Sequence, residues 1–406
     1  MASVIVEATA KRSAPVSRAS WLRSPQRVWL RRALFQVHLW VGLALTLYAI
    51  VIGVSGSALV FREQIEHALR PNLYHLAPTT QRLSLEQSVR QIQTTRQGWK
   101  AFAIRDFDKA DQATTLLMRP ASGVSAANYR MVSFNPYTGE VLFDRLRYAG
   151  LLGWMANLHF YLLTGKTGLL VSGWMALGLL LLCLTGVVLW WPGVRRWASA
   201  LVFHRRSSWH RLNWDLHSVV GFWSSAALIA VSVTGLYFAF PAPVSRMMVF
   251  VTGGSATEKS NVDAIDRTPP TSNAPMLTID QAIDAARREL PSDAPAAYLQ
   301  VPSKIGFPYS ATGYYTGAAP YSQLVSVSLD AQTGKVLSLS DTRHQPRGQR
   351  IVQYFFAIHF GSFAGEGLGG MIVRAVWVFV GLAPLLLAVT GVLMYWNRKL
   401  RSLWRR

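Results

Sequence analysis

The sequence predicts an α-helical membrane protein with four transmembrane helices in two tandem repeats, each repeat carrying an external α+β domain. Three observations support this fold class. The 406 residues are 51% hydrophobic and have a positive mean hydropathy. Four apolar stretches reach the roughly 20 residues that a helix needs to cross a bilayer. This composition excludes a single water-soluble core. The second half of the chain also resembles the first, which predicts two repeats.

The internal resemblance is clearest at the start of each half. The stretch "HLWVGLALTLYAIVIGVSGSALVF" (38–61) aligns with "HSVVGFWSSAALIAVSVTGLYFAF" (217–240). Both begin His-x-x-x-Gly and carry a Ser/Thr-Gly pair at the same offset. Three further pairs of stretches align in the same order: 83–92 with 277–286, 135–141 with 330–336, and 184–192 with 389–397. Since each half returns to the side where it began, the repeats are expected to share one direction across the membrane.

Positive charge is concentrated at the ends of the apolar stretches. Residues 1–37, 191–216 and 397–406 together carry +15 of the formal +21 net charge. If the four helices alternate in direction, all three segments lie on one side, which the positive-inside rule makes the cytoplasm. We therefore expect a bacterial inner-membrane protein in contact with membrane lipid, with both termini cytoplasmic. Because the orientation of the helices in the membrane already explains the excess of positive charge, no nucleic-acid partner is expected.

The expected segments follow in chain order. They are a basic cytoplasmic N-terminus (1–33), the first span (34–60), a first external domain (61–157), an outer-surface segment with a histidine (158–167), the second span (168–191), a basic cytoplasmic loop (192–217), the third span (218–240), a second external domain (241–356), another outer-surface segment with a histidine (357–370), the fourth span (371–396) and a basic cytoplasmic C-terminus (397–406).

Each external domain reads as one helix on an antiparallel sheet. A helical pattern runs from Leu83 to Thr95 and is opened by Ser84, with Gln87 three residues on. Alternating strand patterns follow, and "NPYTGEV" (135–141) predicts a tight turn in which glycine takes a positive φ. The second half has the same features. Residues 252–275 have the composition of a flexible linker.

Four of the nine histidines occupy matching positions in the two halves. His38 and His217 begin the first helix of each half, and His159 and His359 precede the second. A single histidine at a membrane edge is usually an interface residue. Four at matched positions favour a site, since an imidazole in an apolar bundle is a functional candidate by default. Two imidazoles without cysteine or carboxylate suit structural zinc poorly but provide the two axial ligands of a six-coordinate b-type haem.

Glycines give these sites space. Each predicted span has at least one Ser/Thr-Gly pair, and by the helical rise one such glycine in each span lies at the depth of a histidine pair. They either let a flat ring approach the backbone or serve small-residue helix packing. They are Gly56, Gly186, Gly235 and Gly391.

Other side chains receive plainer interpretations. Arg374 is a candidate partner for a haem propionate, although snorkelling to the headgroups is the favoured role. His210 is a weak alternative ligand near the predicted cytoplasmic pair, His38 and His217. Asp215 either orients a ring or ends the loop, and the loop is preferred. The tyrosine-rich stretch at 306–321 either receives a bulky ligand or forms a plain strand and turn, the favoured reading.

This pattern resembles the PepSY-associated transmembrane family, also called iron-regulated membrane proteins. The resemblance runs from residue 31 onward and rests on "HLWVGL", "DLHSVVGFW", "LHF", "IHF", "LTGVVLWWPG" and the "TGEV" and "TGKV" turns. It implies PepSY-like external domains, two haem b groups, and ferric-siderophore reductase activity. It also implies that the axial ligands of the haem irons are His38, His217, His159 and His359.

The expected function is electron transfer to a periplasmic acceptor, most simply a ferric siderophore. No G-x-G-x-x-G motif follows a predicted strand, so the donor is expected to be a cytoplasmic protein, a quinol or a small reductant. The alternative is a non-enzymatic, membrane-anchored interaction or regulatory protein that uses its external domains. A transporter is a weaker third possibility, because no intramembrane carboxylate is evident for a proton relay.

Overall fold

The computed structural model describes residues 29–79, 81–122, 129–204, 208–253, 275–302 and 306–400. The predicted basic N-terminus falls largely outside the described residues, as do positions 205–207 of the predicted loop. Nearly all of the predicted 252–275 linker and positions 401–406 of the predicted C-terminus also lie outside them.

Four helices are long and apolar enough to cross a membrane, which confirms the four predicted spans. They are α2 (Trp29–Leu59), α6 (Lys166–Trp190), α7 (Trp209–Ala239) and α11 (Gly367–Tyr395), the last continuing as a π-helical turn at Trp396–Leu400. Helices α2 and α7, each of 31 residues, are about 46 Å long, more than the hydrocarbon core requires.

Helix α7 begins nine residues before the predicted start at 218 because its polar first turns find partners. Asn213 donates from Nδ2 to the carbonyl of Thr390 at 3.0 Å. Asp215 accepts from Nε of Arg211 at 2.9 Å and from the backbone N–H of His204. A buried carboxylate and a buried amide with such partners do not end a helix, although the sequence alone suggests that they should.

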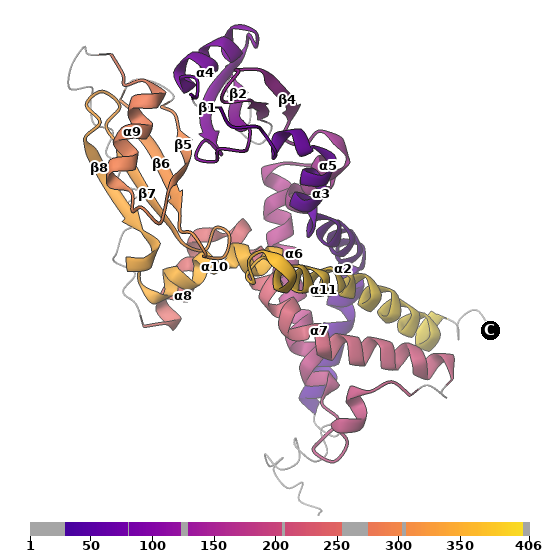
Figure 1. The fold of residues 1–406 in the computed structure, drawn as a ribbon. Coiled ribbons are helices and arrows are strands. Elements are labelled where there is room, and N and C mark those ends of the chain that lie inside the picture. The colour runs from indigo at the N-terminus through magenta and orange to yellow at the C-terminus, as the bar shows by residue number, and fades with distance from the viewer. Residues whose placement is uncertain are drawn as a thin grey trace, which may run out of the picture. The chain divides into compact units, whose positions relative to one another are not determined.

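The shorter α-helices and the strands follow the same order in both halves of the chain, whereas the 3-10 turns differ (Figure 1). The first half contains α3 (Arg62–Leu69), η2 (Pro71–Leu73), α4 (Leu85–Thr94), β1 (Trp99–Arg105), β2 (Thr114–Pro120), β3 (Arg130–Phe134), β4 (Val141–Leu146) and α5 (Gly150–Tyr161). The second contains η3 (Ala198–Leu201), α8 (Pro241–Val251), α9 (Ile279–Glu289), β5 (Ala296–Gln300), β6 (Tyr309–Tyr314), β7 (Leu324–Leu329), β8 (Val336–Asp341), η4 (Thr342–His344) and α10 (Arg347–Phe360).

The chain forms two compact units, which are described separately below. Unit 1 comprises the described residues within 1–47, 178–229 and 385–406, and therefore holds one end of each long helix. Unit 2 comprises 48–177 and 230–384, and holds the other ends together with all the strands and the short helices α3, α4, α5, α8, α9 and α10.

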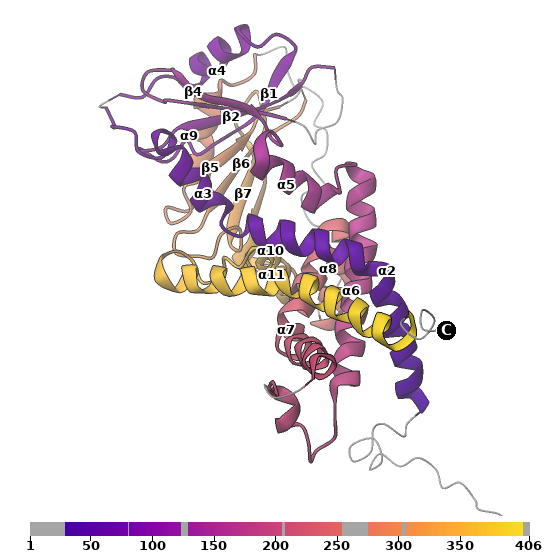
Figure 2. The same ribbon diagram turned by 90° about the vertical axis from the view of Figure 1, so that its right-hand side faces the viewer.

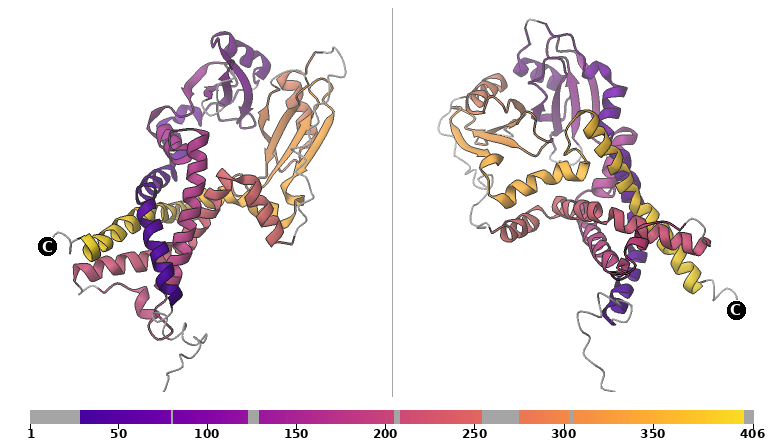
Figure 3. Two further views of the ribbon diagram at one scale, coloured as in Figure 1. Left: turned by 180° about the vertical axis from the view of Figure 1, so that it is seen from behind. Right: turned by 60° about the horizontal axis from the view of Figure 1, so that its bottom comes forward.

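All eight described strands in unit 2 form one antiparallel sheet, in the order β4-β3-β2-β1-β5-β6-β7-β8 (Figure 2). The sequence predicts two α+β domains, and the structure joins them edge to edge where β1 pairs with β5, Ile104 opposite Leu299. The two sets of strands are coloured purple and orange in Figure 3. Helix α4 packs on β1, and α9 packs on β5, β6 and β7. Joining the two edges protects strands that would otherwise be open to aggregation.

The predicted local signals of the sheet domain are confirmed. Ser84 is the N-cap of α4 and accepts a hydrogen bond from the backbone N–H of Gln87 at 3.3 Å. In the turns after β3 and β7, Gly139 and Gly334 have φ angles of 73° and 71°. Only glycine adopts this conformation without steric cost.

The two sheet helices cap each other across the junction. Asp280 of α9 accepts hydrogen bonds from the backbone N–H groups of Leu85 and Glu86 at the start of α4, at 2.9 and 3.1 Å, and from the Ser84 hydroxyl at 2.6 Å. In return, Glu86 accepts from the backbone N–H of Ile279 at 3.0 Å. Each carboxylate therefore serves the free N–H groups and the positive dipole end of the other helix.

We expect Asp280→Ala to destabilise α4 more than α9, because the lost oxygens lie at the start of α4. The expected loss is about 1–2 kcal/mol, the usual cost of removing a helix cap. Hydrogen exchange of the full chain in detergent measures it, and the 85–94 amides should exchange faster. Asp284→Ala is the matched control on the same helix, since its side chain is 64% exposed. Equal exchange in both variants would contradict the reciprocal caps.

Candidate functional site

In unit 1, two of the four matched histidines lie side by side. His38 of α2 and His217 of α7 have ring centres 6.4 Å apart, with their planes at 84°. Nδ1 of His38 lies 2.9 Å from the Thr185 hydroxyl on α6. Nδ1 of His217 lies 2.9 Å from the Thr390 hydroxyl on α11. Each of the four long helices thus contributes one side chain to this site, two histidines and two threonines.

In unit 2, the other two histidines form a second pair of the same construction. His159, in the last turn of α5, and His359, in the last turn of α10, have ring centres 6.2 Å apart, with their planes at 59°. Nδ1 of His159 lies 3.1 Å from the Ser55 hydroxyl on α2, and Nδ1 of His359 lies 2.8 Å from the Thr234 hydroxyl on α7. The structure therefore brings together all four histidines predicted from the sequence as two pairs, which we name after the predicted topology the inner pair (His38 and His217) and the outer pair (His159 and His359).

The hydroxyl groups fix which ring nitrogen carries the proton. Each hydroxyl donates its own hydrogen to the carbonyl four residues earlier in its helix, as Thr185 does to Leu181 at 2.7 Å. Its oxygen then accepts from the ring, so Nδ1 is the protonated nitrogen and Nε2 keeps a free lone pair. The remaining hydroxyls donate in the same way: Ser55 to Val51, Thr234 to Ala230 and Thr390 to Leu386.

Burial keeps the outer rings in the neutral form that binds metals. The pKa of His159 is lowered to about 4 by burial. The pKa of His359 is lowered to about 3 by burial and, less strongly, by the neighbouring His159. At neutral pH both imidazoles are uncharged, as a ligand to iron must be.

The four predicted glycines lie against the imidazoles. A Cβ on Gly56 would lie 2.8 Å from Cε1 of His159, and one on Gly186 would lie 3.3 Å from Cε1 of His38. The corresponding distances are 3.7 Å for Gly235 to His359 and 3.5 Å for Gly391 to His217. From the sequence, these glycines are expected to allow the approach of a flat ring or to serve helix packing. In the structure all four lie beside a histidine ring, but only Gly56, and less strictly Gly186, is close enough that a Cβ would crowd the ring, whereas Gly235 and Gly391 leave an ordinary van der Waals distance.

Sequence reasoning missed the residue before each glycine. The Ser/Thr-Gly pairs were recognised, but only the glycine was given a role. The hydroxyl residue orients the imidazole, and the glycine beside it lies against the edge of the same ring. Both residues of the dipeptide therefore contact one histidine. The repeated Ser/Thr-Gly spacing was the signal that identifies Ser55, Thr185, Thr234 and Thr390.

We expect Thr390→Val to weaken metal or cofactor binding by the inner pair about 10- to 100-fold, the usual effect of losing such an orienting partner. Valine keeps the shape of threonine but leaves Nδ1 of His217 without its acceptor. Thr46→Val on α2 is the control, because the Thr46 hydroxyl donates only to the Gly42 carbonyl in its own helix. Equal binding by both variants in a titration would contradict the orienting role.

Arg374 of α11 is buried in unit 2, with an exposed fraction of 6%. Its guanidinium makes no hydrogen bond or ion pair with any described residue, which does not fit the favoured snorkelling role. Three residues on, Trp377 packs against Gly361, which follows the His359 turn, and its indole N–H is buried without a partner. A buried, unpaired cation is costly, so these donors suit an anionic group such as a carboxylate.

The remaining candidates do not join either pair. Asp215 binds His204 and Arg211 rather than His217, and it lies within α7, so it neither orients a ligand ring nor ends the loop as the sequence suggested. His210 has no contact with the inner pair among the described residues. Cys183 is a free thiol of α6.

The donor set suits a haem better than a structural metal ion. No group of three or more His, Cys, Asp or Glu side chains able to hold a metal occurs in the described part of the chain, so each pair supplies two ligands only. With metal–nitrogen bonds of about 2 Å, as at zinc, and ring centres about 1.1 Å behind the ligating nitrogens, two imidazoles on opposite sides of one iron have centres about 6 Å apart. Both pairs have this spacing, at 6.4 and 6.2 Å.

Comparison with known families agrees with this architecture. A family model described as the PepSY-associated TM region matches residues 35–398, a range that includes both histidine pairs. No curated protein matches the chain.

Proposed function

Because the chain belongs to the family of the PepSY-associated TM region, we propose that it is a di-haem b reductase of the bacterial inner membrane. It would carry electrons from the cytoplasmic side to a periplasmic acceptor, and a ferric siderophore is the acceptor we favour. The observation that carries the proposal is the double pair of histidines. In each ring Nδ1 is held by a hydroxyl and Nε2 is left free, at the ring separation that one iron requires.

The protein's own residues do three things in this scheme. The histidines would hold the haem iron through Nε2, and the hydroxyls fix their tautomer and orientation. Their hydrogen bonds also make Nε2 more basic, which would favour the ferric state of a bound haem. In unit 2, Arg374 and Trp377 provide donors for a propionate. When bound, each haem would supply one-electron redox chemistry that these side chains lack.

A ferric siderophore suits such a reductase chemically. Oxygen-rich chelators hold the hard, highly charged Fe(III) more tightly than Fe(II), so adding one electron loosens the complex. Basic segments at the predicted cytoplasmic ends of the spans support this orientation in the membrane, and electrons would then enter on that side. The donor would be a cytoplasmic protein, a quinol or a small reductant. The alternative, a non-enzymatic interaction protein, assigns no role to four hydroxyl-anchored imidazoles.

Direct oxidation of the reduced protein tests the proposal. Purified protein is reduced with dithionite, freed of excess reductant, and mixed with a ferric siderophore in the presence of an Fe(II)-specific dye. We expect a b-type spectrum that reoxidises while the dye detects one Fe(II) for each electron lost. The redox-inert gallium(III) form of the same siderophore is the control. A colourless preparation, or a reduced spectrum unchanged by the ferric complex, would refute the reductase.

A further inference from the structure

Helix α8 is a short, apolar helix that follows a membrane-spanning helix almost without a break. Span α7 ends at Ala239 and α8 begins at Pro241, so the chain between them reaches at most about 7 Å. No Asp, Glu, Lys or Arg follows Asp215 in α7, and the apolar part of the span therefore continues to its last residue. Helix α8 must lie at the level where α7 leaves the membrane.

The two sides of α8 have different surroundings. One side packs on α10, where Val244 joins Val352 and Phe355 in a small buried core. The two helices approach closely, because a Cβ on Gly348 of α10 would lie 2.7 Å from the Cα of Val249. The other side of α8 has no protein cover among the described residues.

This uncovered side is a continuous apolar face. Met247, Phe250 and Val251 are spaced i, i+3 and i+4, so they lie on one side of the helix. Phe250 is 82% exposed and Val251 is 70% exposed. Of the 11 residues of α8, only Ser245 and Arg246 are polar, and Arg246 is exposed beside this face. An arginine there keeps its stem on apolar surface while its guanidinium reaches lipid phosphates.

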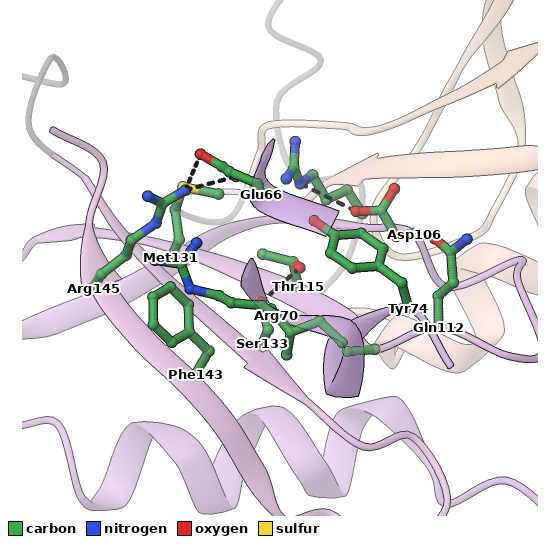
Figure 4. Close-up of a pocket in the computed structure, with 13 residues that line it drawn as sticks. Glu66, Arg70, Tyr74, Asp106, Gln112, Thr115, Met131, Ser133, Phe143 and Arg145 are labelled. Atoms are coloured by element: carbon green, nitrogen blue, oxygen red, sulfur yellow. Dashed lines mark hydrogen bonds and ion pairs between the residues drawn. The ribbon is translucent and has the colours of Figure 1, made fainter. Parts of the chain in front are cut away.

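The short helix at the matching position of the first half is built differently. Helix α3 also follows a span, α2, but it is held to the sheet domain by charge. Its Glu66 accepts two hydrogen bonds from Arg145 of β4, at 3.0 and 3.1 Å, beside a cavity of about 40 Å³ (Figure 4). The fold therefore does not require an apolar helix at this position, and the composition of α8 reflects what surrounds it.

We propose that the exposed face of α8 (Met247, Phe250 and Val251) inserts into the lipid surface at the predicted outer end of α7 and holds α10 there. Lipid is the occupant because the face continues an apolar span and is bordered by a cation, as in helices that lie in the plane of the membrane interface. Since α10 carries His359 in its last turn, the membrane surface sets the height of this histidine, whatever the outer pair binds.

Spin labels test the position of the face in the full chain, reconstituted in vesicles of phosphatidylethanolamine and phosphatidylglycerol. Cys183→Ala removes the single native cysteine, and Phe250→Cys receives the label. We expect frequent collisions with oxygen, protection from a water-soluble nickel chelate, and a depth of about 5–10 Å. Phe379→Cys on span α11, where Phe379 is 73% exposed, is the lipid control. Asp284→Cys on α9, where the side chain is 64% exposed, is the water control.

Two results would overturn the inference. Access of the nickel chelate equal to that in Asp284→Cys would place the face in water. Protection from both oxygen and the chelate would mean that protein covers it, either a second copy of the chain or residues 254–274.

Hydrogen exchange in the same vesicles tests the link to α10. We expect Phe250→Asp to raise the exchange rate of the 347–360 amides severalfold, because a carboxylate does not stay in the apolar boundary and α10 loses its support. Phe250→Leu keeps an apolar side chain and should exchange like the wild type. Equal exchange in the two folded variants overturns the inference. Neither measurement requires a bound haem, so failure here leaves the reductase proposal untouched.

Discussion

Replacing His38 by alanine is expected to halve the haem content of the protein, from two haems per chain to one. The reason is the division of the site: His38 belongs to the inner pair in unit 1, and the outer pair in unit 2 shares none of its residues. His159→Ala should also leave one haem, but with the other spectral component missing. The measurement is the pyridine haemochrome absorbance per chain, together with the reduced spectrum.

His344→Ala is the matched control for these variants. His344 lies in η4, where its Nδ1 is 3.0 Å from Asp341 and its side chain is 85% exposed. We expect this variant to keep two haems and both spectral components. Loss of both haems from His38→Ala, with the chain still folded by circular dichroism, would contradict two independent pairs. Retention of both haems would contradict the ligand assignment.

Gly56→Ala is expected to damage the outer site, whereas Gly235→Ala is expected to leave it nearly intact. The two glycines face the two rings of the same pair, but with different clearance. An added Cβ would lie 2.8 Å from Cε1 of His159 and 3.7 Å from Cε1 of His359. The first distance forces a ring or helix to move, and the second is an ordinary van der Waals contact.

Overpacking of this kind typically costs about 1–3 kcal/mol, which corresponds to roughly 5- to 150-fold weaker haem binding by the outer pair. Haem titration of the haem-depleted variants measures the difference, with Gly235→Ala as the matched control. A general packing role for the glycines predicts equal losses in the two variants. Equal affinities would therefore contradict the view that Gly56 makes room for the imidazole.

The four spans and the histidine positions could be predicted from the sequence because their signals are local. A run of some 20 apolar residues has few alternatives to a transmembrane helix. The turns at Gly139 and Gly334 and the cap at Ser84 likewise depend on a few neighbouring residues. The matched histidines were visible because the two halves could be aligned.

Features formed between distant segments were not predictable. The pairing of β1 with β5 and the exchange of caps between Asp280 and Glu86 depend on two domains meeting in one register. A single strand pattern does not encode its neighbour. The hydroxyl partner of each histidine also comes from another helix, more than 100 residues away in the chain. Only the three-dimensional arrangement assigns Ser55 or Thr185 to a particular ring.

The haem content of the wild-type chain tests the central claim most directly. Protein purified in mild detergent from cells able to make haem is assayed for haem and for protein by amino-acid analysis. Two hydroxyl-anchored histidine pairs predict two b-type haems per chain, both six-coordinate and low-spin in the reduced spectrum. A folded protein that binds none, even after haem is added, would contradict the account.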